Sequence, residues 1–166
     1  MMNILSKIAA ATGGLLLVAN ALAAECASYF PHFGKLNGRV ELVTHHNLNH
    51  YDDYNGYLGK TEAESDGTLK FYDAYNRYLG YAEPVGNGEI RYYDDYNRYL
   101  GKSEPEFGDR IAYYDSYNRR LGYAEHRADR VMYYDDYNRQ RGYHELLSGR
   151  VVFYDSYNRR LGYSEP

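Results

Sequence analysis

The sequence contains no tryptophan, a single cysteine and only four prolines among its 166 residues. The lone cysteine, Cys26, excludes an internal disulfide and leaves either a free thiol or a bond to a second chain, and so an oligomer. Lipidation of Cys26 is disfavoured because Glu25 stands where lipoproteins have a small residue. Charges of one sign never form a block, which argues against nucleic acid or an anionic membrane as a partner.

Long apolar runs are also lacking beyond the N-terminus, and the first 23 residues have the pattern of a signal peptide. Lys7 supplies a positive charge, residues 8–18 are apolar, and Ala21-Leu22-Ala23 is a small-x-small cleavage site. We therefore expect the mature chain to begin at Ala24, to carry no transmembrane segment, and to be periplasmic or secreted in a bacterium. An uncleaved anchor is the alternative. Cleavage removes Lys7 and no acidic residue, so the mature chain is acidic.

Tyrosine is in excess, with 23 residues, and the tyrosines mark a repeated phrase. Each copy reads aliphatic, x, aromatic, Tyr, Asp, x, Tyr, Asn, Arg, x, Leu, Gly, Tyr or Lys, small, Glu. Such self-similarity is the signature of a repeat protein. The Tyr-Asp pairs, which follow one another at intervals of 21, 21, 21, 20 and 20 residues, begin at Tyr51, Tyr72, Tyr93, Tyr114, Tyr134 and Tyr154.

Each copy predicts a β-hairpin. In the last copy, residues 151–155 are strand formers, and residues 159–165 form the returning strand. Ser156-Tyr157-Asn158 fits a three-residue loop in which Asn158 adopts the left-handed conformation. In the first copy Gly56 replaces the arginine, which predicts a tighter, two-residue turn at Asn55-Gly56.

This loop fixes a register, and the register sorts the side chains onto two faces. The expected core face pairs Asp155 with Arg159, Phe153 with Leu161 and Val151 with Tyr163. The expected opposite face carries Tyr154, Val152, Arg160, Gly162 and Ser164. Glycine on that face would let a neighbouring tyrosine ring lie over bare backbone.

Six such units predict an all-β fold, an array of six antiparallel β-hairpin repeats of 20–21 residues. A single hairpin is barely stable in water, so the units must pack on one another. An open twisted or spiralling sheet is the expected form, and a closed, flower-like ring is the alternative. The expected organisation is a signal peptide (1–23), an N-terminal capping segment (24–49) and a six-unit repeat domain (50–166).

The phrase Tyr154-Asp155-Ser156-Tyr157-Asn158-Arg159 resembles the Tyr-Asp (YD) repeats of Rhs-type proteins, over residues 50–165. Asn158 takes the place of that family's left-handed glycine, and the leucine is delayed to Leu161. The resemblance implies an extended antiparallel β-strip that encloses or displays other polypeptide and is not itself catalytic. The layout is similar, more distantly, to short hairpin-repeat β-flower proteins and to aromatic cell-wall-binding repeats, which depend on the tryptophan that this chain lacks.

No pattern in the chain indicates catalysis, and we expect a non-enzymatic protein without a cofactor or a metal. A catalytic group need occur only once, so the six repeated aspartates are better explained as turn partners of the arginine across the loop. His45, His46 and His50 offer imidazoles to a metal, but a histidine-rich polar strand is the favoured interpretation. The repeated aspartates are Asp52, Asp73, Asp94, Asp115, Asp135 and Asp155.

Ligand binding is expected around the positions whose residue differs between copies, since most other positions of the repeat are constant. Flat tyrosine rings beside hydrogen-bond donors suit sugar rings or an extended peptide, and packing between neighbouring units is the alternative. Arg141 replaces the leucine of the other copies, so it needs an acidic partner or a route for its guanidinium to reach water. Either the sheet opens there, or Arg141 reaches out to a binding partner. The candidate ligand-binding residues are Tyr51, Tyr57, Tyr72, Tyr78, Tyr93, Tyr99, Arg120 and Arg141.

These features together predict an exported, non-enzymatic β-repeat protein that binds or scaffolds at the cell envelope. The expected ligand is a glycan or a peptide, and the expected partner is a glycan or a protein of the cell envelope. The alternative is an accessory or structural component of a secreted enzyme or effector system of the Rhs-like kind.

Overall fold

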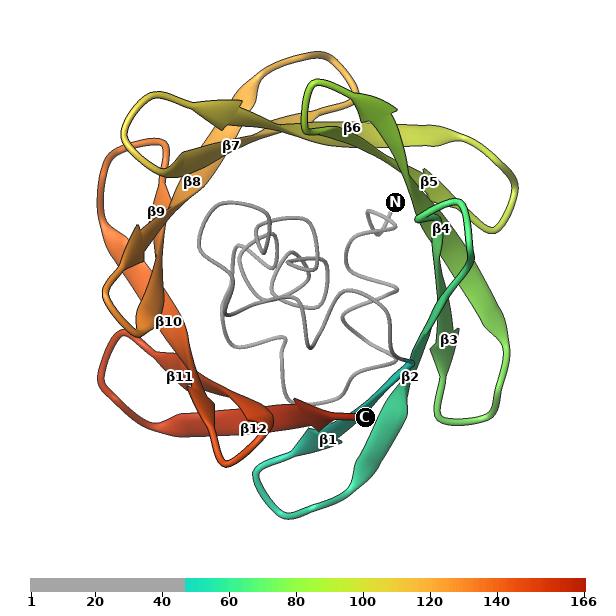
Figure 1. The fold of residues 1–166 in the computed structure, drawn as a ribbon, viewed down its shortest axis with the longest axis vertical. Coiled ribbons are helices and arrows are strands. Elements are labelled where there is room, and N and C mark those ends of the chain that lie inside the picture. The colour runs from blue at the N-terminus through green and yellow to red at the C-terminus, as the bar shows by residue number, and fades with distance from the viewer. Residues whose placement is uncertain (1–46) are drawn as a thin grey trace.

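Twelve antiparallel strands form a closed barrel in the computed structural model, which describes residues 47–166. The strands follow chain order around the barrel, and β12 pairs with β1 (Figure 1). The prediction of an all-β fold of antiparallel hairpins is confirmed. The expected open sheet is wrong, and the closed ring is the form observed. The strands are β1 (Leu48–Asp52), β2 (Tyr57–Ala63), β3 (Leu69–Asp73), β4 (Tyr78–Gly86), β5 (Glu89–Asp94), β6 (Tyr99–Glu106), β7 (Arg110–Asp115), β8 (Arg120–Arg127), β9 (Arg130–Asp135), β10 (Gln140–Leu147), β11 (Arg150–Asp155) and β12 (Arg160–Glu165).

The barrel closes because the first and last units carry the same complementary edges as all the others. At the seam Tyr51 lies opposite Tyr163 and Asp52 lies opposite Gly162. Inside the array the same pairs recur, for example Tyr143 with Tyr154 between β10 and β11. An open end would expose a row of unpaired backbone groups, and pairing β12 with β1 satisfies both rows at once.

Each loop that follows an odd-numbered strand has the three-residue form that the sequence predicted for the last copy. In the last one, the Asp155 N–H donates to the Arg159 carbonyl at 3.0 Å and the Asn158 N–H donates to the Asp155 carbonyl at 3.1 Å. Asn158 has a φ of 64°, in the left-handed region. The first turn is built in the same way, with the Asp52 N–H bound to the Gly56 carbonyl. The two-residue turn predicted for that copy is therefore wrong.

A β-bulge displaces the register beyond the turn and corrects the predicted faces. Tyr154 lies opposite Arg160, but Phe153 lies opposite Gly162 instead of Leu161. The bulge puts two residues of β12 against one of β11, which reverses the alternation along the rest of β12. Ser164 therefore shares the face of Val151. Tyr163 lies on the opposite face, beside Val152, where the sequence analysis had placed Ser164.

The bulge explains the repeated glycine, which does not serve as a platform for a tyrosine ring. Gly162 has a φ of 156°, and a Cβ at this position would lie 2.2 Å from the Tyr51 carbonyl oxygen of the neighbouring unit. Gly59 stands in the same relation to the carbonyl of Tyr72. Only glycine allows both this conformation and this close approach between units.

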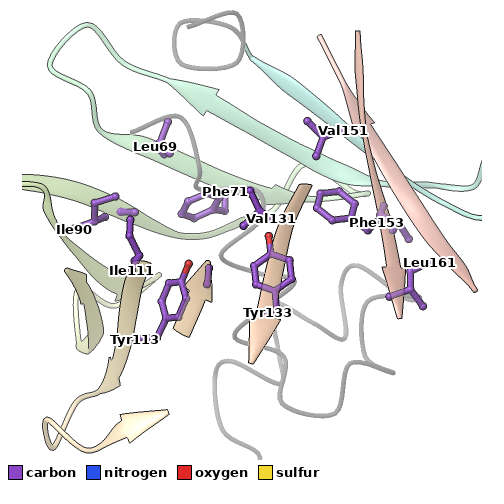
Figure 2. Close-up of a cluster of buried hydrophobic side chains, with 13 residues drawn as sticks. Leu69, Phe71, Ile90, Ile111, Tyr113, Val131, Tyr133, Val151, Phe153 and Leu161 are labelled. Atoms are coloured by element: carbon purple, nitrogen blue, oxygen red, sulfur yellow. The ribbon is translucent and has the colours of Figure 1, made fainter. Parts of the chain in front are cut away.

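The hydrophobic core lies on the inner face of the barrel. Figure 2 shows side chains from several strands of the wall turned toward one another. Polar side chains on this face are hydrogen-bonded, as in the pairs Tyr92–Ser103 and Tyr133–His144, with separations of 2.8 and 2.6 Å. The labelled members of the core are Leu69, Phe71, Ile90, Ile111, Tyr113, Val131, Tyr133, Val151, Phe153 and Leu161.

Some sequence-based expectations concern residues outside the described part of the chain. The signal peptide (1–23), Cys26, His45 and His46 lie there, with most of the capping segment (24–49). The final residues of that segment, Leu48 and Asn49, belong to β1. Residues 47–166 contain no helix with the length and apolar character needed to cross a membrane.

Candidate binding surface

A belt of tyrosine rings runs around the outer face of the barrel. Within the first three hairpins the register places two tyrosines directly opposite each other on adjacent strands, as the sequence predicted, with their ring planes steeply inclined to each other. Tyr93 and Tyr99, for example, have ring centroids 5.8 Å apart. The other two pairs, Tyr51–Tyr57 and Tyr72–Tyr78, both have centroids 5.7 Å apart.

Between hairpins the belt is continued by stacked rings. Tyr81 stacks on Tyr93 with centroids 4.8 Å apart and planes 12° apart. In two copies the residue after the repeated glycine is lysine instead of tyrosine, and its ammonium group then lies over the ring of the neighbouring hairpin. Lys102 Nζ, for example, lies 5.3 Å from the centre of the Tyr114 ring. The equivalent contacts are Lys60–Tyr72, Tyr123–Tyr134, Tyr143–Tyr154 and Tyr51–Tyr163. Packing between neighbouring units, the alternative to ligand binding, therefore accounts for one face of many of these rings.

Two candidate arginines have different surroundings. Arg120 lies on the outer face opposite Tyr114, and its Nη2 donates to Glu106 at 2.7 Å. Arg141 is not part of this surface, because it lies where Leu161 packs into the core. Its Nη2 donates to the Asp135 carboxylate at 2.7 Å. The expected need for an acidic partner is thus confirmed.

The aspartates are turn partners, as predicted. Asp94 Oδ1 accepts the backbone N–H groups of Tyr96 and Arg98, both at 2.8 Å, and its Oδ2 accepts Nε of Arg98 at 2.6 Å. Burial by itself would raise the pKa of Asp135. The backbone and guanidinium of Arg139, together with Arg141, outweigh burial and lower that pKa to about 2. The Asp135 carboxylate is therefore charged at neutral pH, and both of its oxygens accept hydrogen bonds.

An open groove of about 430 Å³ lies on the outer face, over the third hairpin. It is lined by Glu89, Arg91, Tyr93, Tyr99, Lys102 and Asn118. The first five come from β5 and β6, and Asn118 reaches the groove from the loop between β7 and β8. Tyr99 is 38% exposed. The groove thus combines two of the predicted tyrosines with amide, ammonium, guanidinium and carboxylate groups.

The charges of the groove neutralise one another. Arg91 Nε donates to Glu89 at 2.8 Å, and Lys102 Nζ lies 3.7 Å from the same carboxylate. Lys102 is also hydrogen-bonded to Glu104, which raises the pKa of the lysine. Burial raises the pKa of both Tyr93 and Tyr99, so their phenols are protonated at neutral pH.

Sequence reasoning missed a second set of tyrosines, those in the loops of the hairpins. Their exposed fractions run from 71% to 86%. The sequence did contain a signal, because the residue before the loop Asn is tyrosine in every copy. These residues, which we call the rim tyrosines, are Tyr54, Tyr75, Tyr96, Tyr117, Tyr137 and Tyr157.

The histidine cluster enters the described structure only through His50. Both of its ring nitrogens are hydrogen-bonded at 2.7 Å, Nδ1 to Ser164 and Nε2 to Thr61. Residues 47–166 contain no group of three or more potential ligands arranged to hold a metal ion.

Comparison of the chain with protein-family models, with curated proteins and with solved structures finds no match.

Proposed function

We propose that this chain is an exported, non-enzymatic binding module of the cell envelope, and that the groove over the third hairpin binds a glycan. The observation that carries the proposal is the half-exposed ring of Tyr99 within a groove of about 430 Å³. This volume lies in the range of sites that hold small ligands. An aromatic face supplies apolar contact to the C–H groups of a sugar, and the groups around it supply hydrogen bonds.

The charge balance of the groove favours a neutral ligand. Arg91 and Lys102 are both engaged with Glu89, and Lys102 also binds Glu104. An anionic ligand such as a phosphate would have to displace these carboxylates from their cations. Sugar hydroxyls can bond to the existing network at its edges, as donors and as acceptors, without breaking it.

The closed wall favours a glycan over an extended peptide. Peptides commonly bind a β-sheet by adding a strand to a free edge. The twelve described strands all have two neighbours, so the barrel offers no such edge between residues 47 and 166. A peptide would have to bind through side chains alone.

The test is calorimetric titration of the mature chain with soluble oligosaccharides of increasing length, derived from chitin, cellulose and peptidoglycan. We expect binding by at least one series, and Tyr99→Ala should weaken it about two- to tenfold, since an aromatic contact contributes roughly 0.5–1.5 kcal/mol. The matched control is Gln140→Ala, at the equivalent position of the fifth hairpin, which should bind like the wild type. Failure of every series, or equal weakening by both variants with unchanged melting temperatures, would refute a glycan site in this groove.

A further inference from the structure

The rim tyrosines all lie at one end of the barrel. In an antiparallel barrel whose strands follow chain order, the loops after β1, β3, β5, β7, β9 and β11 share one end, and the loops after even-numbered strands share the other. The first set carries the six rim tyrosines. The second set differs from copy to copy in length and sequence and has no shared aromatic residue.

Turn geometry does not account for these tyrosines. The turn is made by the aspartate that accepts backbone N–H groups and by the left-handed asparagine. The residue between the aspartate and the tyrosine has changed freely and is Asp53, Ala74 or Ser116 in different copies. The tyrosine that follows has not changed in any copy, although its side chain is the most exposed of the loop's bulky groups.

Stacking on arginine does not account for them either. In five loops the guanidinium lies over the tyrosine ring, with distances to the ring centre of 5.1 to 5.7 Å. In the first loop Gly56 replaces the arginine, and yet Tyr54 is present and is the most exposed of the six, at 86%. A tyrosine kept only to cover an arginine would have no purpose there.

Closure of the barrel arranges the six rings at one level. Repeated units that close into a ring are related by rotation about its axis, so equivalent residues lie at equal heights. Neighbouring rim tyrosines belong to hairpins two strands apart, which separates them by about 10 Å along the rim. One monosaccharide can therefore touch only one rim tyrosine, whereas a flat, extended surface can touch several at once.

The chemistry of the rim indicates what kind of surface fits it. Each rim arginine is paired with the turn aspartate of its own loop, as Arg98 is with Asp94, so these cations are neutralised. Asp53, Asp95 and Asp136 are exposed beside the tyrosines and form no ion pair with any residue of the described range. The loops contain no leucine, isoleucine, valine or phenylalanine. Acidic loops without aliphatic side chains are poorly suited to an anionic surface or to the interior of a bilayer.

We propose that the rim tyrosines form a second binding site, which adsorbs the barrel end-on to the flat face of an insoluble neutral polysaccharide. The ordered chains of such a polymer present the C–H faces of their sugar rings in a plane, and each rim tyrosine stacks on one of them. Individual contacts are weak, and their number makes the attachment stable. This site is separate from the groove, and it shares with the proposed function only the class of ligand.

The test is retention of the full mature protein on microcrystalline chitin and cellulose. Tyr54→Ala, Tyr137→Ala and Tyr157→Ala are combined, because these three adjacent loops lie across the seam and away from the groove. We expect the partition coefficient to fall by about tenfold or more with the melting temperature nearly unchanged. Ser116→Ala combined with Ser156→Ala changes exposed neighbours in two loops and should leave retention intact.

Three further measurements separate this proposal from others. Replacing the same three tyrosines by leucine should lower retention on the polysaccharide about as much as the alanine substitutions do, because leucine keeps apolar area but loses the flat ring. Binding of phosphatidylcholine vesicles that survives the leucine substitutions would instead identify the rim as a lipid-binding surface and overturn the proposal. Wild-type retention by the triple alanine variant would also overturn it. The soluble oligosaccharides of the groove experiment bind elsewhere, so their titration with the triple alanine variant should be unchanged. Either proposed site can therefore be refuted without refuting the other.

Discussion

Tyr51 and Tyr163, the tyrosines that meet where the first strand pairs with the last, are stacked with centroids 4.9 Å apart and planes 15° apart. Tyr143 and Tyr154, in the middle of the wall, are stacked at 4.8 Å and 13°. The seam is therefore built like the other junctions between hairpins. A chain of identical junctions has no designated ends, and the integrity of the ring depends on the last junction as much as on any other.

Removing the last hairpin should therefore do more than lower stability by one step. A chain that ends at Ser148 loses β11 and β12 and exposes the edges of β1 and β10. Five hairpins cannot restore the same strand tilt and diameter, so unpaired edges remain and should associate. We expect oligomers or aggregates in light scattering and a large drop in melting temperature. A monomeric remainder with a modest drop, as in an open array, would contradict this.

The turn aspartates that are buried should be essential for stability. Asp94 is 0% exposed, and Asp94→Ala leaves two backbone N–H groups and the Arg98 guanidinium without their acceptor. We expect a loss of about 2–3 kcal/mol in the free energy of unfolding, measured by urea denaturation. The neighbouring Asp95→Ala, at an exposed position, should stay within about 0.5 kcal/mol of wild type. A loss of unfolding free energy for Asp94→Ala that is as small as that for Asp95→Ala would show that the carboxylate network contributes little.

Glycine at the bulges should be required for the close contact between neighbouring hairpins. An alanine Cβ at Gly122 would lie 2.2 Å from the Tyr134 carbonyl oxygen, which belongs to the next hairpin. Gly122→Ala should therefore push two units apart and destabilise the barrel by about 3 kcal/mol or more. Gly149→Ala is the control, since its φ of 81° is also positive but no atom lies within 4 Å of the added Cβ. It should cost about 1 kcal/mol, the conformational term alone. Equal losses in urea denaturation would show that backbone conformation is the only reason for glycine.

The features predicted correctly from the sequence are those determined within one hairpin. The loop, its left-handed asparagine and the pairing of Tyr93 with Tyr99 follow from about ten consecutive residues. The bulge was missed because the close approach that accompanies it, between Gly162 and the Tyr51 carbonyl of the neighbouring unit, does not exist in an isolated hairpin. Once the bulge is missed, every side chain beyond it is assigned to the wrong face, as happened for Tyr163 and Ser164.

Closure and the sites depend on relations between units, and these were harder to predict. The sequence repeat is compatible with both an open and a closed array of hairpins, and only the strand geometry decides which of the two forms. The predicted tyrosines do lie together on the outer face, but the groove also needs Glu89, Arg91 and Asn118, which the repeat gives no reason to select. The rim tyrosines were visible in every copy, and their meaning emerged only when closure placed them around one end.

Acid should weaken the barrel before its aspartates titrate, because two histidines are buried in a neutral state. Burial lowers the pKa of His50 to about 4, and burial together with the charge of His126 lowers the pKa of His144 to about 3, from an ordinary value of 6.5. Between pH 6.5 and about 4 the unfolded chain therefore binds more protons than the folded barrel. The free energy of unfolding should fall as the pH is lowered through this range.

His50 alone should account for about 3 kcal/mol of that fall, since each unit of pKa corresponds to about 1.4 kcal/mol. The aspartates add their loss only below an ordinary pKa of 3.8, because their pKa values are lowered in the folded state. Urea denaturation at pH 7, 5.5 and 4.5 measures the slope. His50→Phe, which installs the residue found at the equivalent positions Phe71 and Phe153, should flatten it by about half while His144 remains. An unchanged slope would mean that His50 is already exposed to water and protonated near its ordinary pKa, and that the seam opens there before the rest of the barrel.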